Sequence, residues 1–132
     1  ASGRAILASL AMGADFAYMG SAFIATEEAR ASDEYKQCIV DSNSDDIVYS
    51  NLFTGVHGNY LAASIRNAGL DPANLPESDP SAMNFGGNAV KAWKDIWGCG
   101  QGIGAVKSVQ PVAEVVARLR REYQAARERL IQ

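Results

Sequence analysis

The apolar positions of the first twenty residues change from a helical to a strand-like pattern. Residues 4–12 are good helix formers with almost no polar face, which predicts a buried helix, and Gly13 follows where a left-handed helix end favours glycine. Residues 16–19 then form an apolar run as long as a buried parallel strand, and Gly20 and Ser21 end it. A helix, a tight turn and a strand in succession are typical of α/β folds, in which the loops at the carboxyl ends of strands carry the chemistry.

The following residues predict short helices and one further β-like stretch. We expect a helical turn at 22–25 opened by Ser21, and a helix at 33–41 capped by Ser32. The second of these helices should pack through three residues on one face: Tyr35, Cys38 and Ile39. Residues 47–49 are β-like, and a helix is predicted for 60–68, ended by Gly69.

The C-terminal half combines a long loop, a glycine-rich block and an amphipathic helix. Residues 70–87 contain three prolines among polar residues and predict a surface loop. Residues 93–107 hold four glycines, which indicates that something approaches this backbone closely. A last helix should begin with Pro111 at its first position, with apolar residues at helical spacing and Glu114 paired with Arg118.

The chain offers one convincing buried parallel strand, and such a strand needs neighbours on both sides. A (β/α)8 barrel takes roughly 250 residues. We therefore expect this chain to be a piece that supplies about half of such a barrel.

Composition narrows the class of protein. The 132 residues are 48% apolar and 20% charged, which is ordinary for a globular protein. A net charge of -3 disfavours binding to nucleic acid or to an anionic membrane surface. No apolar run reaches the ~18 residues that span a bilayer, and no signal-peptide layout is present, so we expect a soluble cytoplasmic protein. Cys38 and Cys99 stand far apart, which indicates neither a disulfide framework nor a metal site.

The residues with most chemical meaning are Met19, Gly20 and Ser21. A glycine directly after a strand lets a ligand approach the backbone, and the first N–H groups of the next helix suit a phosphate. In barrels, a phosphate commonly binds in the loops after strands seven and eight beside a short helix. Taken alone, Gly-Ser after a strand is a weak signal, and a plain turn is the simpler interpretation.

Two longer blocks make the resemblance specific. Residues 2–4 and 8–15, followed by 19–28 (Met-Gly-Ser-Ala-Phe-Ile-Ala-Thr-Glu-Glu), closely resemble the nitronate monooxygenase family, formerly called 2-nitropropane dioxygenases. Residues 93–97 and 98–104 (Gly-Cys-Gly-Gln-Gly-Ile-Gly) resemble the C-terminal motif of that family. The match therefore covers nearly the whole chain.

The resemblance implies an α/β fold, the C-terminal portion of an FMN-binding (β/α)8 TIM barrel with a largely helical C-terminal extension. Residues 1–30 would be the last βα unit, and 31–132 the extension. Gly20 and Ser21, after Met19, match half of the family's phosphate site, whose glycine pair should precede Ala1. Gln101 and Gly102 match the C-terminal motif, expected near the flavin ring or the mouth of its pocket.

The implied reaction converts a nitronate to a carbonyl compound and nitrite with O2. The family's proton-handling histidine lies on an earlier part of the barrel, so no catalytic residue is expected here. His57 lies in a glycine-flanked loop, and a solvated turn residue is the simpler interpretation. By the same reasoning Trp93 and Trp97 should share one packed helix face, and Cys99 should be a small buried residue. Glu27 and Glu28 should be solvated helix charges.

Two alternatives remain open from the sequence. A flavin-dependent reductase of quinones or enoyl thioesters, using NAD(P)H, could occupy the same barrel. A helical interaction module without catalysis would make Gly20 and Ser21 a simple turn. The partners implied by the first reading are a nitronate, O2 and the remainder of the barrel chain, with a homodimer left open. We also expect that the isolated piece neither binds FMN tightly nor turns over substrate.

Overall fold

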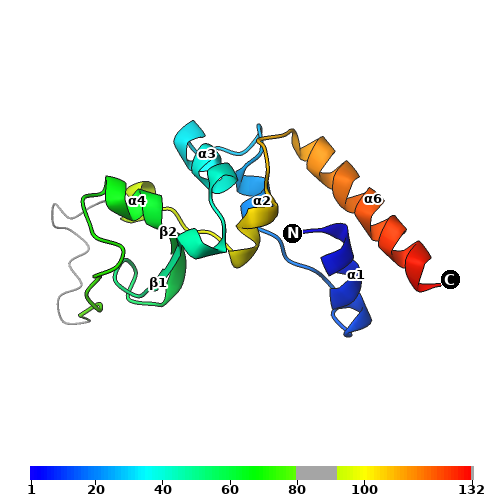
Figure 1. Ribbon diagram of the computed structural model, residues 1–132, viewed down its shortest axis with the longest axis horizontal. Helices are drawn as coiled ribbons and strands as arrows, with labels where there is room; N and C mark the ends of the chain where they lie inside the picture. Colours follow the sequence, from blue (N-terminus) through cyan, green and yellow to red (C-terminus); the bar gives the residue numbers. More distant parts are fainter. Residues whose placement is uncertain (80–91, 132) are drawn as a thin grey trace.

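The computed structural model describes residues 1–79 and 92–131, and its helices surround one short hairpin. The helices are α1 (Gly3–Ala11), α2 (Ser21–Ile24), α3 (Asp33–Asp41), α4 (Ala62–Asn67), α5 (Ala92–Asp95) and α6 (Val112–Leu130). Two 3-10 turns, η1 (Ser44–Asp46) and η3 (Gln101–Ala105), precede the hairpin and α6, respectively. Figure 1 shows the hairpin and α4 toward one end of the molecule, with α1 and α6 at the other. Helix α2 lies between them, so it connects the two ends.

The hairpin consists of β1 (Ile47–Ser50) and β2 (Gly58–Leu61), paired antiparallel with Ile47 opposite Leu61. On the other edge of β2, Tyr60 forms an isolated antiparallel bridge with Gly98. The glycine-rich block therefore lies beside the hairpin as a short third strand-like segment. The predicted β-like stretch at 47–49 is confirmed, whereas the helix predicted from residue 60 begins at Ala62 because Tyr60 and Leu61 pair in β2.

A small core lies where α2, α3, β2 and η3 meet. Its buried residues come from all four elements and from the end of the glycine-rich block: Ala22, Ala25, Ile39, Leu61, Ile103 and Val106. Helix α3 contributes Ile39 to this core, and Ser32 caps the start of the helix, its hydroxyl accepting the Tyr35 N–H at 3.3 Å. The predicted helix at 33–41 and its cap are confirmed. The core fixes η3, which carries Gln101 and Gly102, against α2, which begins at Ser21.

Helices α1 and α6 form a separate packed pair at the other end (Figure 1). They approach so closely at Gly3 that a Cβ atom there would lie 2.1 Å from the Leu119 carbonyl oxygen. Only glycine fits such a contact without moving a backbone. The buried helix predicted at 4–12 is thus wrong in one respect: within α1 only Gly3 is buried, because α6 covers one side of it.

The apolar run at 16–19 is extended but unpaired. Phe16 is 90% exposed and Tyr18 is 99% exposed, and no described strand lies beside them. The prediction of a buried parallel strand is therefore wrong for this chain, since the residues described here supply no neighbouring strand to pair with it.

The C-terminal helix and the loop before α5 differ from expectation in smaller ways. Pro111 is the N-cap of α6 and not its first residue, and Arg118 pairs with Glu122 at 2.9 Å in place of Glu114. Residues 70–79 contain neither helix nor strand, in agreement with the predicted loop, while 80–87 lie outside the described residues. Among the described residues, no helix combines the length and apolar character needed to cross a bilayer.

Candidate functional site

The two predicted motifs meet through one hydrogen bond. Ser21 begins α2, and its Oγ accepts the backbone N–H of Gly100 at 2.7 Å, although the two residues are 79 positions apart. The bond joins Gly20 and Ser21 to residues 98–104, the C-terminal motif that contains Gln101. The structure therefore brings Gly20, Ser21, Gln101 and Gly102 to the same part of the molecule, which we call the Ser21 corner.

The Gly20–Ser21 step retains groups that can donate to an anion. A hydroxyl has one hydrogen and two lone pairs, so Ser21 can accept from Gly100 and still donate its own hydrogen. In α2 the Phe23 and Ile24 N–H groups donate to the Gly20 carbonyl, and the Ser21 and Ala22 N–H groups have no acceptor within the helix. No atom lies within 4 Å of the position that a Cβ atom on Gly20 would take, so the backbone is open on that side. These donors and this open backbone fit an anionic oxygen.

Gln101 and Gly102 line a cavity against the start of the chain. The cavity measures about 340 Å³ and is lined from α1, η1 and η3 by Ala1, Ser2, Ala5, Asn43, Ser44, Gln101, Gly102, Gly104 and Ala105. A Cβ atom on Gly102 would lie 3.5 Å from the Ala1 nitrogen. Met19, the other predicted site residue, is partly buried in the extended segment before Gly20.

The segment that presents Gly100 is held on two sides. On the hairpin side, Leu61 donates to the Trp97 carbonyl at 2.8 Å, and Cys99 donates to the Asn59 carbonyl at 3.1 Å. On the α3 side, the Tyr35 hydroxyl donates to the Gly98 carbonyl. Sequence reasoning placed Tyr35 in a packing face and missed this contact, because its partner lies 63 residues away and no local pattern reports it.

Ser64 is a second contact that the sequence did not reveal. Its fully buried hydroxyl accepts the Trp97 N–H at 3.0 Å and donates to the Leu61 carbonyl at 2.7 Å. Both of its polar functions are thereby used. Ser64 ties the beginning of the glycine-rich block to the first turn of α4.

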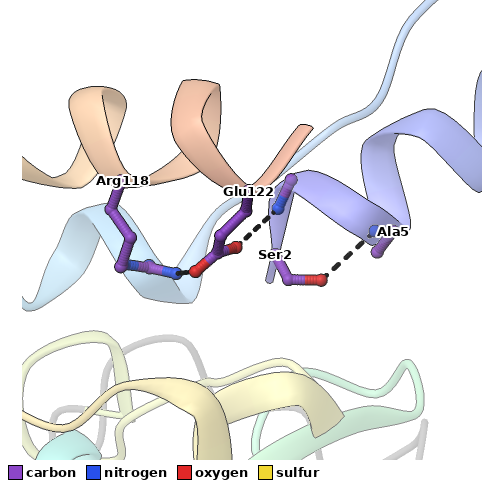
Figure 2. Close-up of polar contacts among 5 residues, drawn as sticks. Ser2, Ala5, Arg118 and Glu122 are labelled. Carbon is purple, nitrogen blue, oxygen red and sulfur yellow. Dashed lines mark hydrogen bonds and ion pairs between the residues drawn. The ribbon is translucent and has the colours of Figure 1, made fainter. Parts of the chain in front are cut away.

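The start of α1 is anchored by α6, as Figure 2 shows for Ser2, Ala5, Arg118 and Glu122. Glu122 Oε2 accepts the Gly3 N–H at 2.8 Å, and its Oε1 pairs with Arg118 at 2.9 Å. Ser2 caps the helix by accepting the Ala5 N–H at 3.2 Å. Partial desolvation acts to raise the pKa of Glu122, but the Gly3 N–H and Arg118 outweigh it and leave that pKa below its ordinary value.

Neither cysteine has the properties of a nucleophile. Burial raises the pKa of the Cys99 thiol to about 11, with repulsion from Cys38 adding to the effect. Burial also raises the pKa of Cys38. Because the thiolate is the reactive form, both thiols stay protonated and inert near neutral pH. Cys99, predicted to be a small buried residue, is only partly buried and packs against the core.

His57 lies away from the Ser21 corner, on the exposed hairpin loop. Its ring stacks on Tyr49, with centroids 4.8 Å apart. It does not line the cavity formed by Gln101 and Gly102. The interpretation as an exposed loop residue fits this position.

Trp97 and Glu28 differ from their predicted settings. Helix α5 ends at Asp95, so Trp97 does not share a helix face with Trp93. The side chain of Trp93 lies outside the described residues. The Trp97 ring stacks on the Tyr35 ring, with centroids 5.1 Å apart. Glu28 follows α2 and is not helical; its carboxylate accepts the Val112 N–H at 2.9 Å and so supplies the side-chain cap that Pro111 cannot give α6.

A wider groove of about 670 Å³ lies between α3 and α4, lined by acidic residues of α3 and by Arg66. None of the predicted site residues lines this groove, whereas Gln101 and Gly102 line the smaller cavity, so the size of the groove does not make it the site. Across residues 1–79 and 92–131, no three His, Cys, Asp or Glu side chains gather where they could hold a metal ion.

Comparison with known sequences points to one family. Residues 1–122 match the family model described as nitronate monooxygenase. A nitronate monooxygenase of Paraburkholderia phytofirmans is 30% identical over 138 residues, which cover 98% of this chain and 37% of that protein. A probable nitronate monooxygenase of Staphylococcus aureus is 32% identical over 77 residues, covering 58% of this chain and 21% of that protein. The chain thus spans less than two fifths of the length of these relatives.

Solved structures show the fold. A nitroalkane oxidase from Streptomyces ansochromogenes matches with a TM-score of 0.72 and 27% identity, over 96% of this chain and 38% of the other. FabK from Thermotoga maritima matches with a TM-score of 0.66 and 21% identity, over 98% of this chain and 43% of the other. Both are TIM-barrel flavoenzymes, so the predicted fold class, part of a (β/α)8 barrel with a largely helical extension, is confirmed.

Proposed function

The chain belongs to the nitronate monooxygenase family, and we propose that it forms the C-terminal part of an FMN-dependent enzyme that oxidises nitronates to carbonyl compounds and nitrite with O2. The observation that carries this proposal is the Ser21–Gly100 hydrogen bond, because it joins the two motifs on which the family resemblance rests. Residues 1–30 would complete the barrel in this enzyme, and 31–132 would form its extension.

The residues at this corner fit the phosphate of a flavin. The Ser21 hydroxyl and the first N–H groups of α2 are donors, and Gly20 leaves its backbone open to a ligand. Met19, which directly precedes Gly20, would belong to the same cofactor-binding set. Gln101 and Gly102 would face the flavin or the mouth of its pocket, because they line the cavity at the start of α1. When bound, FMN would supply the redox chemistry between the nitronate and O2.

The part played by this chain is binding and orientation. Nothing among its described residues resembles a general base at the corner: His57 is on the hairpin, and the two thiols have raised pKa values. The family resemblance implies that a histidine on an earlier part of the barrel would handle the proton at the substrate carbon. Because the chain would supply half of the phosphate site and no identified base, we expect the 132 residues alone to bind FMN weakly and to turn over no substrate.

A flavin-dependent NAD(P)H reductase would use the same corner, so the reaction must be tested directly. The FMN-loaded full-length protein that carries this chain would be reduced anaerobically by a nitronate and, separately, by NADH and NADPH, and nitrite would be assayed after oxygen is readmitted. Bleaching by the nitronate followed by nitrite release supports the monooxygenase. Bleaching by a nicotinamide alone would assign the reductase, and a colourless preparation would favour a non-catalytic module.

A further inference from the structure

We propose that Tyr35 is a positioning residue for Ser21: by holding the Gly98 carbonyl, its hydroxyl fixes the Gly100 N–H that the Ser21 hydroxyl accepts. The sequence predicted only a packing role for Tyr35. The functional consequence rests on the proposed role of Ser21 toward the flavin phosphate, whereas the positioning itself is a property of this chain.

Tyr35 holds the glycine-rich block in two ways. Its ring stacks nearly parallel on Trp97, with centroids 5.1 Å apart and planes 11° apart, while its hydroxyl donates to the Gly98 carbonyl. Tyr35 lies in the first turn of α3, where Ser32 accepts its backbone N–H, and Ile39 of the same helix is fully buried in the core. The tyrosine is therefore a fixed point against which residues 97 and 98 are placed.

The hairpin side holds the residues on either side of Gly98. Trp97 is bound through both backbone groups, to Leu61 and to the Ser64 hydroxyl, and the Cys99 N–H is bound to the Asn59 carbonyl. The Tyr35 hydroxyl donates to the Gly98 carbonyl from the α3 side. Gly98 has no side chain to restrict its backbone, so a bond to its carbonyl has more effect on peptide orientation than the same bond would at a bulkier residue.

Gly100 follows Cys99, and its N–H donates to Ser21 Oγ. Once that N–H occupies one lone pair of Ser21 Oγ, the hydroxyl hydrogen is directed elsewhere and is available to an external acceptor. A preorganised donor loses less freedom when an anion binds. Tyr35 thus acts on the site through the backbone, without touching the ligand.

The Tyr35 hydroxyl keeps its proton under all ordinary conditions. Burial raises its pKa to about 12, and repulsion from Cys99 and Cys38 adds to the effect. It therefore remains a donor to the Gly98 carbonyl across the neutral range.

The test measures amide hydrogen exchange of Gly100 by NMR in the 132-residue chain. Tyr35→Phe keeps the ring and its stacking on Trp97 but removes the donor. The loss of one hydrogen bond should speed Gly100 exchange by about threefold to tenfold. Tyr49→Phe is the matched control, since Tyr49 is exposed on the hairpin and contacts His57. Exchange of Ile103 and Ile39 reports whether the core is intact.

Ser21→Ala tests the same chain of contacts from its other end. It should speed Gly100 exchange to a similar extent while leaving the Trp97 and Cys99 amides unchanged. Unaltered Gly100 exchange in Tyr35→Phe with an intact core, or equal acceleration in Tyr49→Phe, would overturn the positioning role. If Tyr35→Phe also disturbed the core, Ser21→Ala would decide: an unchanged Gly100 amide in that variant would equally overturn it.

The functional consequence is read in the FMN-loaded full-length protein. Tyr35→Phe should weaken FMN binding by a few fold and leave riboflavin, which lacks the phosphate, unaffected. Faster Gly100 exchange with unchanged FMN affinity would reject the phosphate role of Ser21 and keep the positioning by Tyr35. Unchanged exchange would reject the positioning, whatever the flavin affinity.

Discussion

The two segments that meet at Ser21 have opposite surroundings. Residues 97–100 are bound by the hairpin, by α3 and by Ser21 itself. Residues 15–19 approach the same serine with their large side chains in solvent: Phe16 is 90% exposed and Tyr18 is 99% exposed. One side of the corner is fixed by contacts within this chain, and the other is not.

The difference shows what each segment needs in order to be ordered. The glycine-rich block takes its bonds from elements that this chain contains. The apolar run has a strand-like sequence, but a parallel strand forms only when neighbouring strands accept and donate its backbone hydrogen bonds. The barrel structures that match this chain are more than twice as long as the matched part, 38% of one and 43% of the other.

The largest expected effect lies on the fixed side. Ile103, in η3 between Gly102 and Gly104, is fully buried in the core. Ile103→Ala should destabilise the chain by about 2–5 kcal/mol, since it removes buried methyl groups and leaves a cavity. Urea unfolding of the 132-residue chain would measure this loss as a lower midpoint at an unchanged slope. Val116→Ala, on the exposed side of α6, is the matched control. An equal loss of stability in that variant would contradict the claim that the core fixes the glycine-rich block.

A smaller effect is expected where the block joins α4. Ser64→Ala removes an acceptor from the Trp97 N–H and a donor from the Leu61 carbonyl, both at a fully buried site. Leaving these groups unpaired should cost about 1–3 kcal/mol. Thermal or urea unfolding would measure it beside Ser9→Ala, which removes an exposed hydroxyl bonded within α1. Comparable losses in the two variants would show that the block does not depend on Ser64.

The anchor between α1 and α6 should respond to acid. Because the folded-state pKa of Glu122 lies below its ordinary value of 4.5, the ionised carboxylate stabilises the fold above that pH. This contribution is lost as the pH falls through the lowered pKa. The side chain is 35% exposed, so the effect should stay below about 1 kcal/mol.

The measurement compares wild type with Glu122→Gln in urea at pH 7 and at about pH 3. The wild type should be the more stable at pH 7, and the difference should shrink in acid. Glu128→Gln, a carboxylate on an exposed part of the same helix, is the control. A stability difference between wild type and Glu122→Gln that grows in acid would refute this role of the Glu122 carboxylate.

The smallest effect is expected on the open side. Phe16→Ser should change the stability of the 132-residue chain by no more than about 0.5 kcal/mol, because the ring is already in solvent. The same urea experiment used for Ile103→Ala measures it. A loss approaching that of Ile103→Ala would mean that residues 15–19 are packed after all.

Sequence reasoning succeeded where structure is local. The Ser32 cap of α3, the left-handed Gly13 and Gly69, and the long C-terminal helix follow from residue types at fixed spacings, and all are present. Two blocks of residues also sufficed to indicate the family. For the site, the sequence supplied Gly20, Ser21, Gln101 and Gly102, and the structure places them in one region.

The failures concern contacts between distant residues. The helical periodicity of residues 60–68 did not reveal that Tyr60 pairs with β1. The i,i+4 spacing allowed Arg118 to pair with Glu114 or with Glu122, and it pairs with Glu122, which also binds the Gly3 N–H. Tyr35 was predicted only to pack, and Ser64 was given no role, because their partners lie 63 and 33 residues away. A pattern within one element cannot report such bonds.

The central claim is that Ser21 donates to the flavin phosphate, and one measurement tests it most directly. The affinities of the full-length protein that carries this chain for FMN and for riboflavin would be compared between wild type and Ser21→Ala, with Ser21→Thr retaining the hydroxyl. We expect Ser21→Ala to weaken FMN binding about tenfold, equivalent to roughly 1.4 kcal/mol, while riboflavin binding stays unchanged and Ser21→Thr resembles wild type. Equal weakening for both flavins, or unchanged FMN affinity, would contradict the claim.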